Sequence, residues 1–297
     1  MAPDLAPVGP ETPGEAPVPD GAAPPTGRAG RNLPAAIAVG LTLGVLIVVP
    51  LYSPYRWGFI VVLAAAASVG SWEIVAALRR LGAQPTHLPV LVGGAVMIVE
   101  GYREGSQALF IGLLLTVLAC MVWRLVDPAE GFLRDVSASV FTVAYVPFLA
   151  GFAALLTIPH DGPRRVTAYI VTVVCSDIGG YAAGVAFGRH PMAPSVSPKK
   201  SWEGFAGSAV ACALAGMVFL GPVLHAQVLL GVVFGLAVVV TATLGDLGES
   251  MVKRDIGIKD MGRLLPGHGG LMDRLDSLLT TAPVAFLLLT AFVPLPR

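Results

Sequence analysis

The polar residues that could do chemistry are concentrated in one stretch of this sequence, residues 246–277. Of the 19 acidic and 19 basic residues in the chain, six acidic and five basic lie between positions 246 and 276, with long apolar runs on both sides. A helix ending in this stretch would carry four polar residues on one face, at offsets of zero, three, four and seven. These residues are Asp246, Glu249, Ser250 and Lys253. Such a face is either a solvated helix end with an i,i+4 ion pair or a site for a divalent cation and a phosphate. We favour the site, because acids at membrane depth are costly and tend to be functional.

A second acid pair follows where the last apolar run begins. Asp273 and Asp276 are three residues apart, and Ser277 comes next. Two acid pairs entering a membrane from the same side can meet around a shared ion. Hard oxygen ligands without a His/Cys cluster favour Mg²⁺, with Mn²⁺ as the substitute, over zinc. One cation or two would fit such a group.

Between the two acid pairs lies the glycine-rich segment 266–270, Pro-Gly-His-Gly-Gly. Its glycines permit tight turns whose N–H groups can face an anion. Cationic residues that can pair with phosphate surround it, and together they predict a phosphate-binding pocket. These are Lys253, Arg254, Lys259, Arg263 and Arg274. The sequence leaves His268 open as either a proton donor or a turn residue that bonds its own backbone.

Two further features lie outside this stretch. The segment 195–204 contains Lys199 and Lys200, which are either part of a solvated loop or a second phosphate clamp. Asp177 lies within an apolar run, with Tyr181 one turn further on, and an acid in such surroundings is a candidate site residue.

The composition defines the class of protein that must position these residues. The chain has 297 residues, of which 55% are hydrophobic and 13% charged, and its formal net charge is zero. This excludes an ordinary soluble enzyme and predicts a protein that crosses the membrane several times. The zero net charge gives no indication of a nucleic-acid partner, and none is expected. Cys120, Cys175 and Cys212 all lie in apolar runs without metal-binding spacing, so we expect buried free thiols.

We predict an all-α, polytopic membrane helix bundle with about nine transmembrane helices. Residues 1–32 are rich in Pro, Gly and Ala, and we expect them to form a disordered tail and not a signal peptide. Residues 33–165 would form the N-terminal helices, and 166–297 the catalytic region with cytoplasmic loops 188–203 and 246–277. The expected spans, each about as long as a helix that crosses 30 Å of hydrocarbon, are 33–51, 57–78, 87–102, 107–126, 137–158, 166–187, 204–224, 227–244 and 278–293. Gly180, Gly184 and Gly188 favour close approach of another helix.

The lysines and arginines predict the orientation. With the N-terminus inside, 14 of the 19 fall on one face and five on the other. The five are Arg56, Arg103, Arg164, Arg165 and Arg297. By the positive-inside rule, the first face is cytoplasmic. We therefore expect a multi-pass protein of a bacterial inner membrane, with its active site facing the cytoplasm.

The order of residues from Ser250 to Asp276 resembles the signature of the phosphatidate cytidylyltransferases, also called CDP-diacylglycerol synthases. The matching positions include Ser250, Lys253, Arg254, Lys259, Asp260, Gly262, Pro266, Gly267, His268, Gly269, Gly270, Asp273, Arg274 and Asp276. Segment 197–204 is similar to that family's second motif, with Ser201 where threonine is common. The resemblance covers about residues 170–280.

The resemblance implies the reaction of CTP with phosphatidic acid to give CDP-diacylglycerol and pyrophosphate, with Mg²⁺ required. It implies CTP, phosphatidic acid and the lipid bilayer as partners, and it is compatible with a homodimer. Asp246 and Asp273 would be the principal metal ligands, supported by Asp276 and Glu249. Asp246, Asp273, Lys253, Arg254 and His268 would be catalytic. Substrate phosphates would be bound by Ser197, Lys199, Lys200, Lys259, Arg274, Gly269 and Gly270, and Asp177 would orient substrate.

Three other functions fit parts of the pattern. A CDP-alcohol phosphotransferase is disfavoured because its Asp-Gly-x-x-Ala-Arg motif is absent from the sequence. An ion or phosphate transporter would place its acids along a central path, whereas these gather at one membrane face. A CTP-dependent lipid kinase would release CDP instead of pyrophosphate.

Overall fold

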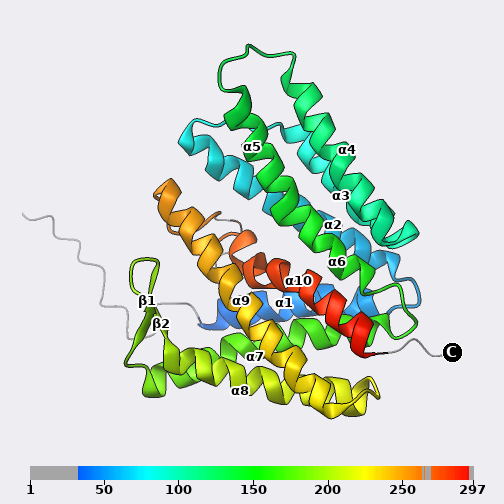
Figure 1. Cartoon of the computed structure of the whole chain (residues 1–297), viewed down its shortest axis with the longest axis vertical. Coiled ribbons are helices and arrows are strands. Elements are labelled where there is room, and N and C mark those ends of the chain that lie inside the picture. Colours follow the sequence, from blue (N-terminus) through cyan, green and yellow to red (C-terminus); the bar gives the residue numbers. More distant parts are fainter. Residues whose placement is uncertain (1–32, 263, 265–268, 294–297) are drawn as a thin grey trace, which may run out of the picture.

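The structure is a computed structural model that describes residues 33–262, 264 and 269–293. Helices dominate it (Figure 1), and a single two-stranded hairpin is the only sheet among these residues. The elements in chain order are α1 (Leu33–Tyr52), α2 (Trp57–Leu78), η1 (Arg79–Leu81), α3 (His87–Glu104), α4 (Ser106–Arg124), α5 (Phe132–Val143), η2 (Ala144–Phe148), α6 (Leu149–Leu155), α7 (Gly162–Phe187), β1 (Pro191–Ala193), β2 (Ser197–Ser201), α8 (Trp202–Val218), η3 (Phe219–Val223), α9 (Val228–Ile256) and α10 (Met272–Phe292).

The all-α polytopic bundle predicted from the sequence is confirmed. Seven of the described helices are long and apolar enough to cross a membrane. Each of the nine expected spans forms a helix, but two of these helices are not both long and apolar enough to be counted among the seven. The apolar part of α1 is short, and α3 carries three charged residues within its 18 positions, at Glu100, Arg103 and Glu104.

The last two helices extend further into the polar stretch than the apolar runs alone predict. Helix α9 continues to Ile256 and α10 begins at Met272, so the connection between them spans only 257–271. With 29 residues at 1.5 Å each, α9 is about 44 Å long and exceeds the hydrocarbon core by several turns. It ends at Gly257, whose φ of 75° closes the helix through a bond from Ile258 N–H to the Lys253 carbonyl. Asp246 to Lys253 therefore lie on a helix, as the spacing of their side chains predicted.

The segment 188–203 contains the hairpin β1–β2, in which Pro191 pairs with Ser201 and Ala193 with Ser197. The Ser201 hydroxyl accepts a hydrogen bond from Gly204 N–H and caps α8. The hairpin is thereby fixed directly to the start of a long helix.

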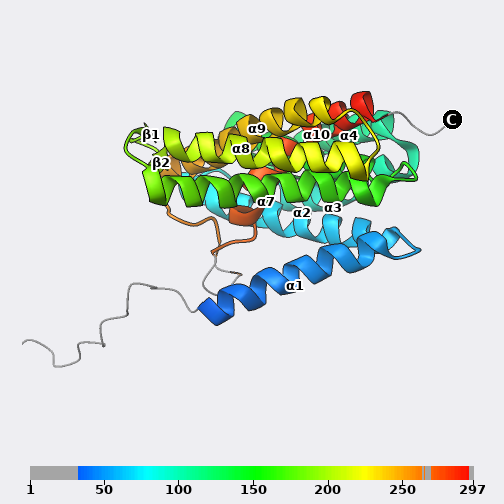
Figure 2. The same cartoon turned by 90° about the horizontal axis from the view of Figure 1, so that it is seen from below.

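Helices α7, α8 and α9 pack closely through small residues, as the glycines of α7 predicted. A Cβ added at Gly180 would come within 2.5 Å of the Ser208 hydroxyl, and one at Gly207 within 2.7 Å of the Gly179 carbonyl. On the other side of α8, Gly216 and Gly231 bring the backbones of α8 and α9 together. In Figure 2, α7 and α8 run side by side, while α1 lies along the outer edge of the bundle.

We expect Gly207→Leu to prevent formation of a stable bundle, because its side chain would overlap Ala183 and the backbone of α7. Detergent-extracted protein should lose its monodisperse peak in size-exclusion chromatography. Gly44→Leu on α1 is the control, since a Cβ there meets nothing within 4 Å. Equal behaviour of the two variants would contradict the role of close packing.

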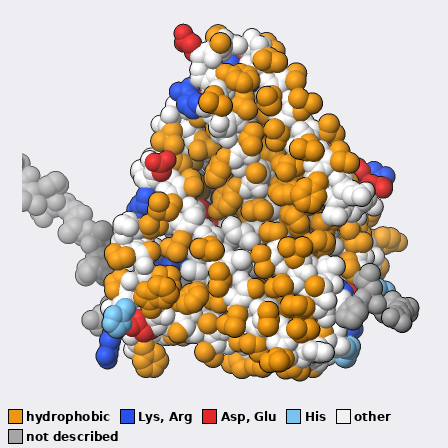
Figure 3. All heavy atoms as spheres, in the orientation of Figure 1, with side chains coloured by type: hydrophobic (Ala, Val, Ile, Leu, Met, Phe, Trp, Pro, Cys, Tyr) orange, Lys and Arg blue, Asp and Glu red, His pale blue; other side chains and the backbone are white. Residues whose placement is uncertain are grey.

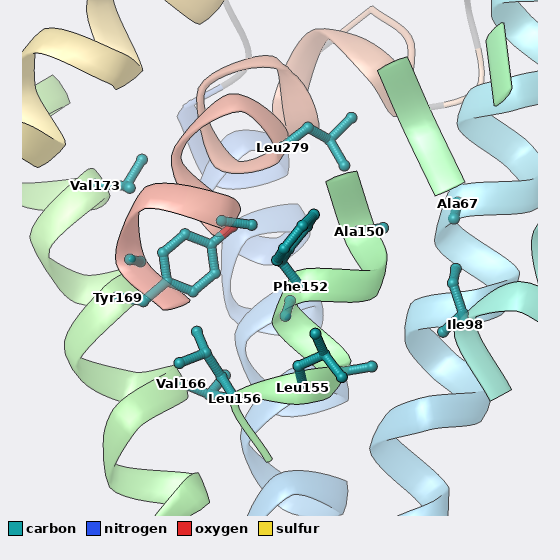
Figure 4. Packing of buried hydrophobic residues seen from close by; sticks show 14 of the residues in the cluster. Ala67, Ile98, Ala150, Phe152, Leu155, Leu156, Val166, Tyr169, Val173 and Leu279 are labelled. Carbon is teal, nitrogen blue, oxygen red and sulfur yellow. The ribbon is translucent and has the colours of Figure 1, made fainter. Parts of the chain in front are cut away.

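Most of the interior is apolar, and so is most of the exterior. Figure 4 shows Phe152 of α6, Val166 and Tyr169 of α7, and Leu279 of α10 gathered in one layer, where the Tyr169 hydroxyl donates to the Leu278 carbonyl. Figure 3 shows hydrophobic side chains over most of the visible face and charged ones along its edges, as a lipid-facing surface requires. The three cysteines are free, two of them buried and Cys175 half-buried, which confirms the expected thiols.

Candidate active site

The end of α9, the start of α10 and the hairpin lie on the same side of the bundle (Figure 1). Residues predicted from both sequence motifs meet there. The site is therefore assembled from two long helices, which fix side-chain positions more firmly than loops do.

Lys253 forms the centre of the site. Its Nζ lies 2.7 Å from Glu249 Oε2 on the same helix and 2.8 Å from Asp273 Oδ1 on α10. The side chains of Glu249 and Asp273 are 0% and 6% exposed, and that of Lys253 is 15% exposed. Ion pairs with so little solvent around them are screened weakly and hold their geometry. Lys253 thus joins α9 to α10.

The second oxygen of Asp273 organises the connection between these helices. Asp273 Oδ2 accepts hydrogen bonds from Met261 N–H at 3.0 Å and from Gly270 N–H at 2.8 Å. Met261 and Gly270, nine residues apart in the connection between α9 and α10, are therefore tied to one carboxylate. His268, which the sequence predicted as a catalytic residue, lies outside the described residues together with Arg263, Pro266 and Gly267. Gly269 is described and has a φ of 79°, a left-handed conformation that favours glycine.

The hairpin contributes a second lysine. Lys200 Nζ of β2 lies 2.5 Å from Asp246 Oδ2 of α9, and the Ser250 hydroxyl donates to the other oxygen of Asp246 at 3.4 Å. One turn beyond Ser250, Arg254 Nε donates to the Val196 carbonyl at 3.4 Å. The two family-like motifs, about 50 residues apart, thus form one site.

The acids of α9 and α10 form a group that could accept a cation. Asp276 lies within electrostatic range of both Glu249 and Asp246. Glu249 Oε1 is buried and has no hydrogen-bond donor among the described residues. A hard cation beside Asp276 would offset the negative charge of these acids and would give Glu249 Oε1 a partner. The acids are nevertheless not preassembled as a cage, since no group of three or more His, Cys, Asp or Glu among the described residues is arranged to hold a metal ion.

A cavity of about 320 Å³ opens beside the Lys200–Asp246 pair, between α7, α8, α9 and the hairpin. Its lining includes Asp177, Tyr181, Lys199, Lys200, Asp246 and Ser277. Asp177 and Tyr181 lie on α7 and are exposed to the cavity side of the bundle. The two lysines add positive charge to the lining, which also includes glycines of α7 and α8. The cavity can therefore receive a molecule with both an anionic and an apolar portion.

The remaining predicted residues lie at the margin of the site. Ser197 and Lys199 are on β2, the first half-buried and the second exposed. Arg254 is exposed at the end of α9, and Lys259 is exposed just beyond it. Arg274 is exposed in the first turn of α10. These positions suit contacts with an incoming anion more than with the interior.

Two residues of the N-terminal half reach this region, although sequence reasoning did not select them. Glu73 of α2 is 1% exposed and accepts hydrogen bonds from Leu271 and Met272 at the start of α10. Tyr145 lies in the π-helical η2, within electrostatic range of Glu249 and Asp276, and its buried hydroxyl has no partner among the described residues. An acid inside an apolar run was the available signal for Glu73.

Fold and site define a polytopic helical membrane protein whose polar site lies at one end of the bundle. A model of the cytidylyltransferase family matches residues 34–292. The chain therefore belongs to this family. It is similar to the phosphatidate cytidylyltransferase of Mycobacterium leprae (strain TN), with 47% identity over 89% of this chain and 90% of the relative. The enzymes so named from Mycobacterium tuberculosis (strain ATCC 25618 / H37Rv) and Pseudomonas aeruginosa are 45% and 35% identical, over 89% and 78% of this chain and 84% and 88% of those relatives.

Proposed function

We propose that this chain is a phosphatidate cytidylyltransferase, which transfers CMP from CTP to phosphatidic acid and releases pyrophosphate. The single observation that carries the proposal is the pair of lysine–carboxylate contacts beside a cavity in a membrane bundle. Lys253 with Asp273 is largely buried, and Lys200 with Asp246 is partly exposed at the edge of the cavity. Similarity to proteins of that name over nine-tenths of both chains supports it.

The chemistry needs cations more than it needs a base. A phosphate oxygen of phosphatidic acid attacks the α-phosphorus of CTP, and the bond from that phosphorus to the bridging oxygen breaks as pyrophosphate leaves. Both partners are anions, so repulsion between them forms a large part of the barrier. Lys200 is a quarter exposed and borders the cavity, which places its charge where a phosphate can replace Asp246 as its partner. Lys253 fixes the relative positions of α9 and α10 and adds positive potential behind the reacting groups.

A membrane position serves the lipid substrate. The cavity lies between long apolar helices, so the acyl chains of phosphatidic acid can remain in the bilayer while its headgroup enters the site. Holding both reactants in one orientation contributes to the rate without further chemical groups.

We propose Mg²⁺ as the cofactor, held by Asp276, Glu249 and Asp246 together with substrate phosphates. Asp273 is less suited to direct ligation than the sequence suggested, because its oxygens already bind Lys253 and two backbone N–H groups. When bound, the ion neutralises charge on the triphosphate and on the pyrophosphate that leaves.

The test is pyrophosphate release by the purified, detergent-solubilised protein, supplied with CTP, phosphatidic acid and Mg²⁺. Release that requires lipid and CTP together, with CDP-diacylglycerol as the lipid product, supports the proposal. CDP with a phosphorylated lipid would identify a lipid kinase instead. A folded sample without either product would overturn the assignment.

Metal removal should abolish this activity. We expect EDTA to lower pyrophosphate release at least about 100-fold, with Mg²⁺ and Mn²⁺ restoring it and Ca²⁺ failing, because Ca²⁺ prefers longer bonds and more ligands. The assay is repeated on Asp276→Asn at rising Mg²⁺. A shift of the half-saturating Mg²⁺ concentration to higher values is expected, whereas an unchanged value would remove Asp276 from the proposed ligands.

We also propose the bacterial inner membrane as the location, with the site at the cytoplasmic face. Of the four arginines on the opposite face that the structure describes, three have structural partners, and these contacts account for their departure from the positive-inside rule. Arg103 pairs with Glu100. Arg56 donates to the carbonyls of Thr157, Pro159 and His160, and the buried Arg165 pairs with Asp161.

A further inference from the structure

Glu73 is a buried carboxylate far in sequence from the site and close to it in space. It lies on α2, within the apolar run Trp57–Leu78, and its side chain is 1% exposed. Oε2 accepts the Met272 N–H at 2.7 Å and Oε1 accepts the Leu271 N–H at 3.1 Å. A buried acid requires hydrogen-bond partners, and this one finds both at the first residues of α10.

Those two N–H groups belong to the unpaired donors at the start of a helix. Leu271 occupies the N-cap position of α10 and has no side-chain oxygen to offer, so this helix lacks a local cap. Glu73 supplies the missing acceptor from another helix. A carboxylate there also interacts favourably with the positive end of the helix dipole.

The glycines of the connecting segment fit around this carboxylate. A Cβ at Gly262 would overlap Glu73 Oε1, and one at Gly270 would approach both carboxylate oxygens within 2.8 Å. One turn before Glu73, Gly70 faces Met272 and Leu275 of α10, where an added Cβ would make ordinary van der Waals contacts. The two signature glycines are therefore explained by an acid that the signature does not contain.

The helix that Glu73 holds carries the acids of the site. Asp273 lies one residue beyond Met272, and Asp276 lies one turn further on. Asp273 in turn positions Lys253 and the backbone at Met261 and Gly270. A small displacement of the first turn of α10 would therefore move all of these groups together.

We infer that Glu73 is a positioning residue for the active site, which caps α10 from the N-terminal half of the bundle and thereby sets the place of Asp273 and Asp276. It touches neither reacting group and acts through α10. The part of this inference that is tested by enzyme activity rests on the proposed cytidylyl transfer. The part that is tested by hydrogen exchange does not.

The test compares Glu73→Gln with Asp135→Asn in the full-length, detergent-solubilised protein. Both substitutions are isosteric and remove a buried acid of the N-terminal half. Asp135 is also 1% exposed and also accepts a backbone N–H, from Gln84, but it pairs with Arg124 away from the site. Three quantities are measured: kcat and KM for CTP, thermal unfolding, and hydrogen exchange in peptides covering 269–275.

In Glu73→Gln the amide NH₂ faces a backbone donor, so one capping bond is lost. We expect kcat to fall about 10- to 100-fold at a temperature well below unfolding, with exchange at Leu271 and Met272 at least tenfold faster. Asp135→Asn should lower thermal stability and leave kcat within about twofold. Gly262→Ala should lower kcat and speed up exchange as Glu73→Gln does. The double variant Glu73→Gln/Gly262→Ala should have a kcat no lower than either single variant, because both changes disrupt the same contact between Glu73 and α10.

Unchanged exchange in Glu73→Gln would overturn the capping role. Faster exchange with a kcat within twofold of wild type, or equal losses of kcat in Glu73→Gln and Asp135→Asn, would overturn the positioning role. If the wild-type protein releases no pyrophosphate, the proposed function fails, and the exchange comparison alone decides whether Glu73 anchors α10.

Discussion

Asp273→Asn is expected to lower kcat about 1,000-fold and to leave the protein folded and inserted in the membrane. The carboxylate accepts Lys253 Nζ through one oxygen and the N–H groups of Met261 and Gly270 through the other. An asparagine amide has one acceptor and two donors, so it must turn its NH₂ group either toward a buried ammonium or toward two backbone donors. In one arrangement Lys253 loses its carboxylate partner, and in the other the N–H groups of Met261 and Gly270 lose theirs. Either loss frees these groups from their positions. Pyrophosphate release by purified protein at saturating CTP measures the loss.

Asp255→Asn is the matched control for this substitution. Asp255 lies at the polar end of α9 and is exposed. Its substitution removes the same charge as Asp273→Asn does, but from a solvent-exposed position. Its kcat should stay within about twofold of wild type. Near-normal activity of Asp273→Asn, or an equal loss in both variants, would show that the contacts of Asp273 do not govern transfer.

The sequence predicted the helical bundle well because membrane-length apolar runs have few structural alternatives. A backbone in hydrocarbon must satisfy its own hydrogen bonds, so such runs become helices. The run 57–78 coincides with the observed α2. The ends of α9 and α10 were less predictable, since hydropathy falls at Asp246 while the backbone remains helical to Ile256. Only the i,i+3 and i,i+4 spacing of the acids indicated that continuation.

The composition of the site was predictable, but its pairing was not. Spacing placed Asp246, Glu249 and Lys253 on one face, and the structure brings Glu249 and Lys253 together with Asp273. The sequence did not indicate that Lys200 binds Asp246, because that contact depends on how the β1–β2 hairpin folds back against α9. Glu73 was missed for a related reason. Its partners are backbone N–H groups about 200 residues away, which no local pattern encodes.

Lys200→Met is expected to lower kcat/KM for CTP about 100-fold. In the resting protein the Lys200 ammonium is held at Asp246 by a 2.5 Å contact at the edge of the cavity. Methionine keeps the length of the side chain and removes its charge, so an incoming phosphate loses a cation while Asp246 stays as an uncompensated anion beside it. Repulsion then replaces attraction at the place where two polyanions must meet, and the loss should be larger than for removal of an ordinary surface charge.

Lys199→Met provides the comparison, because it removes the same charge from the adjacent residue of β2. Lys199 is exposed and borders the same cavity, so its loss should cost about tenfold or less and should shrink as salt is raised. Because Asp246 is also a proposed Mg²⁺ ligand, the double variant Lys200→Met/Asp246→Asn is compared by CTP binding without metal, where it separates two causes. If unbalanced repulsion from Asp246 dominates, neutralising this acid restores part of the CTP affinity; if direct phosphate contact by Lys200 dominates, the double variant is no better than Lys200→Met. Equal effects of Lys199→Met and Lys200→Met at every salt concentration would mean that the Lys200–Asp246 contact has no special part in CTP binding, and that the hairpin contributes only its net charge.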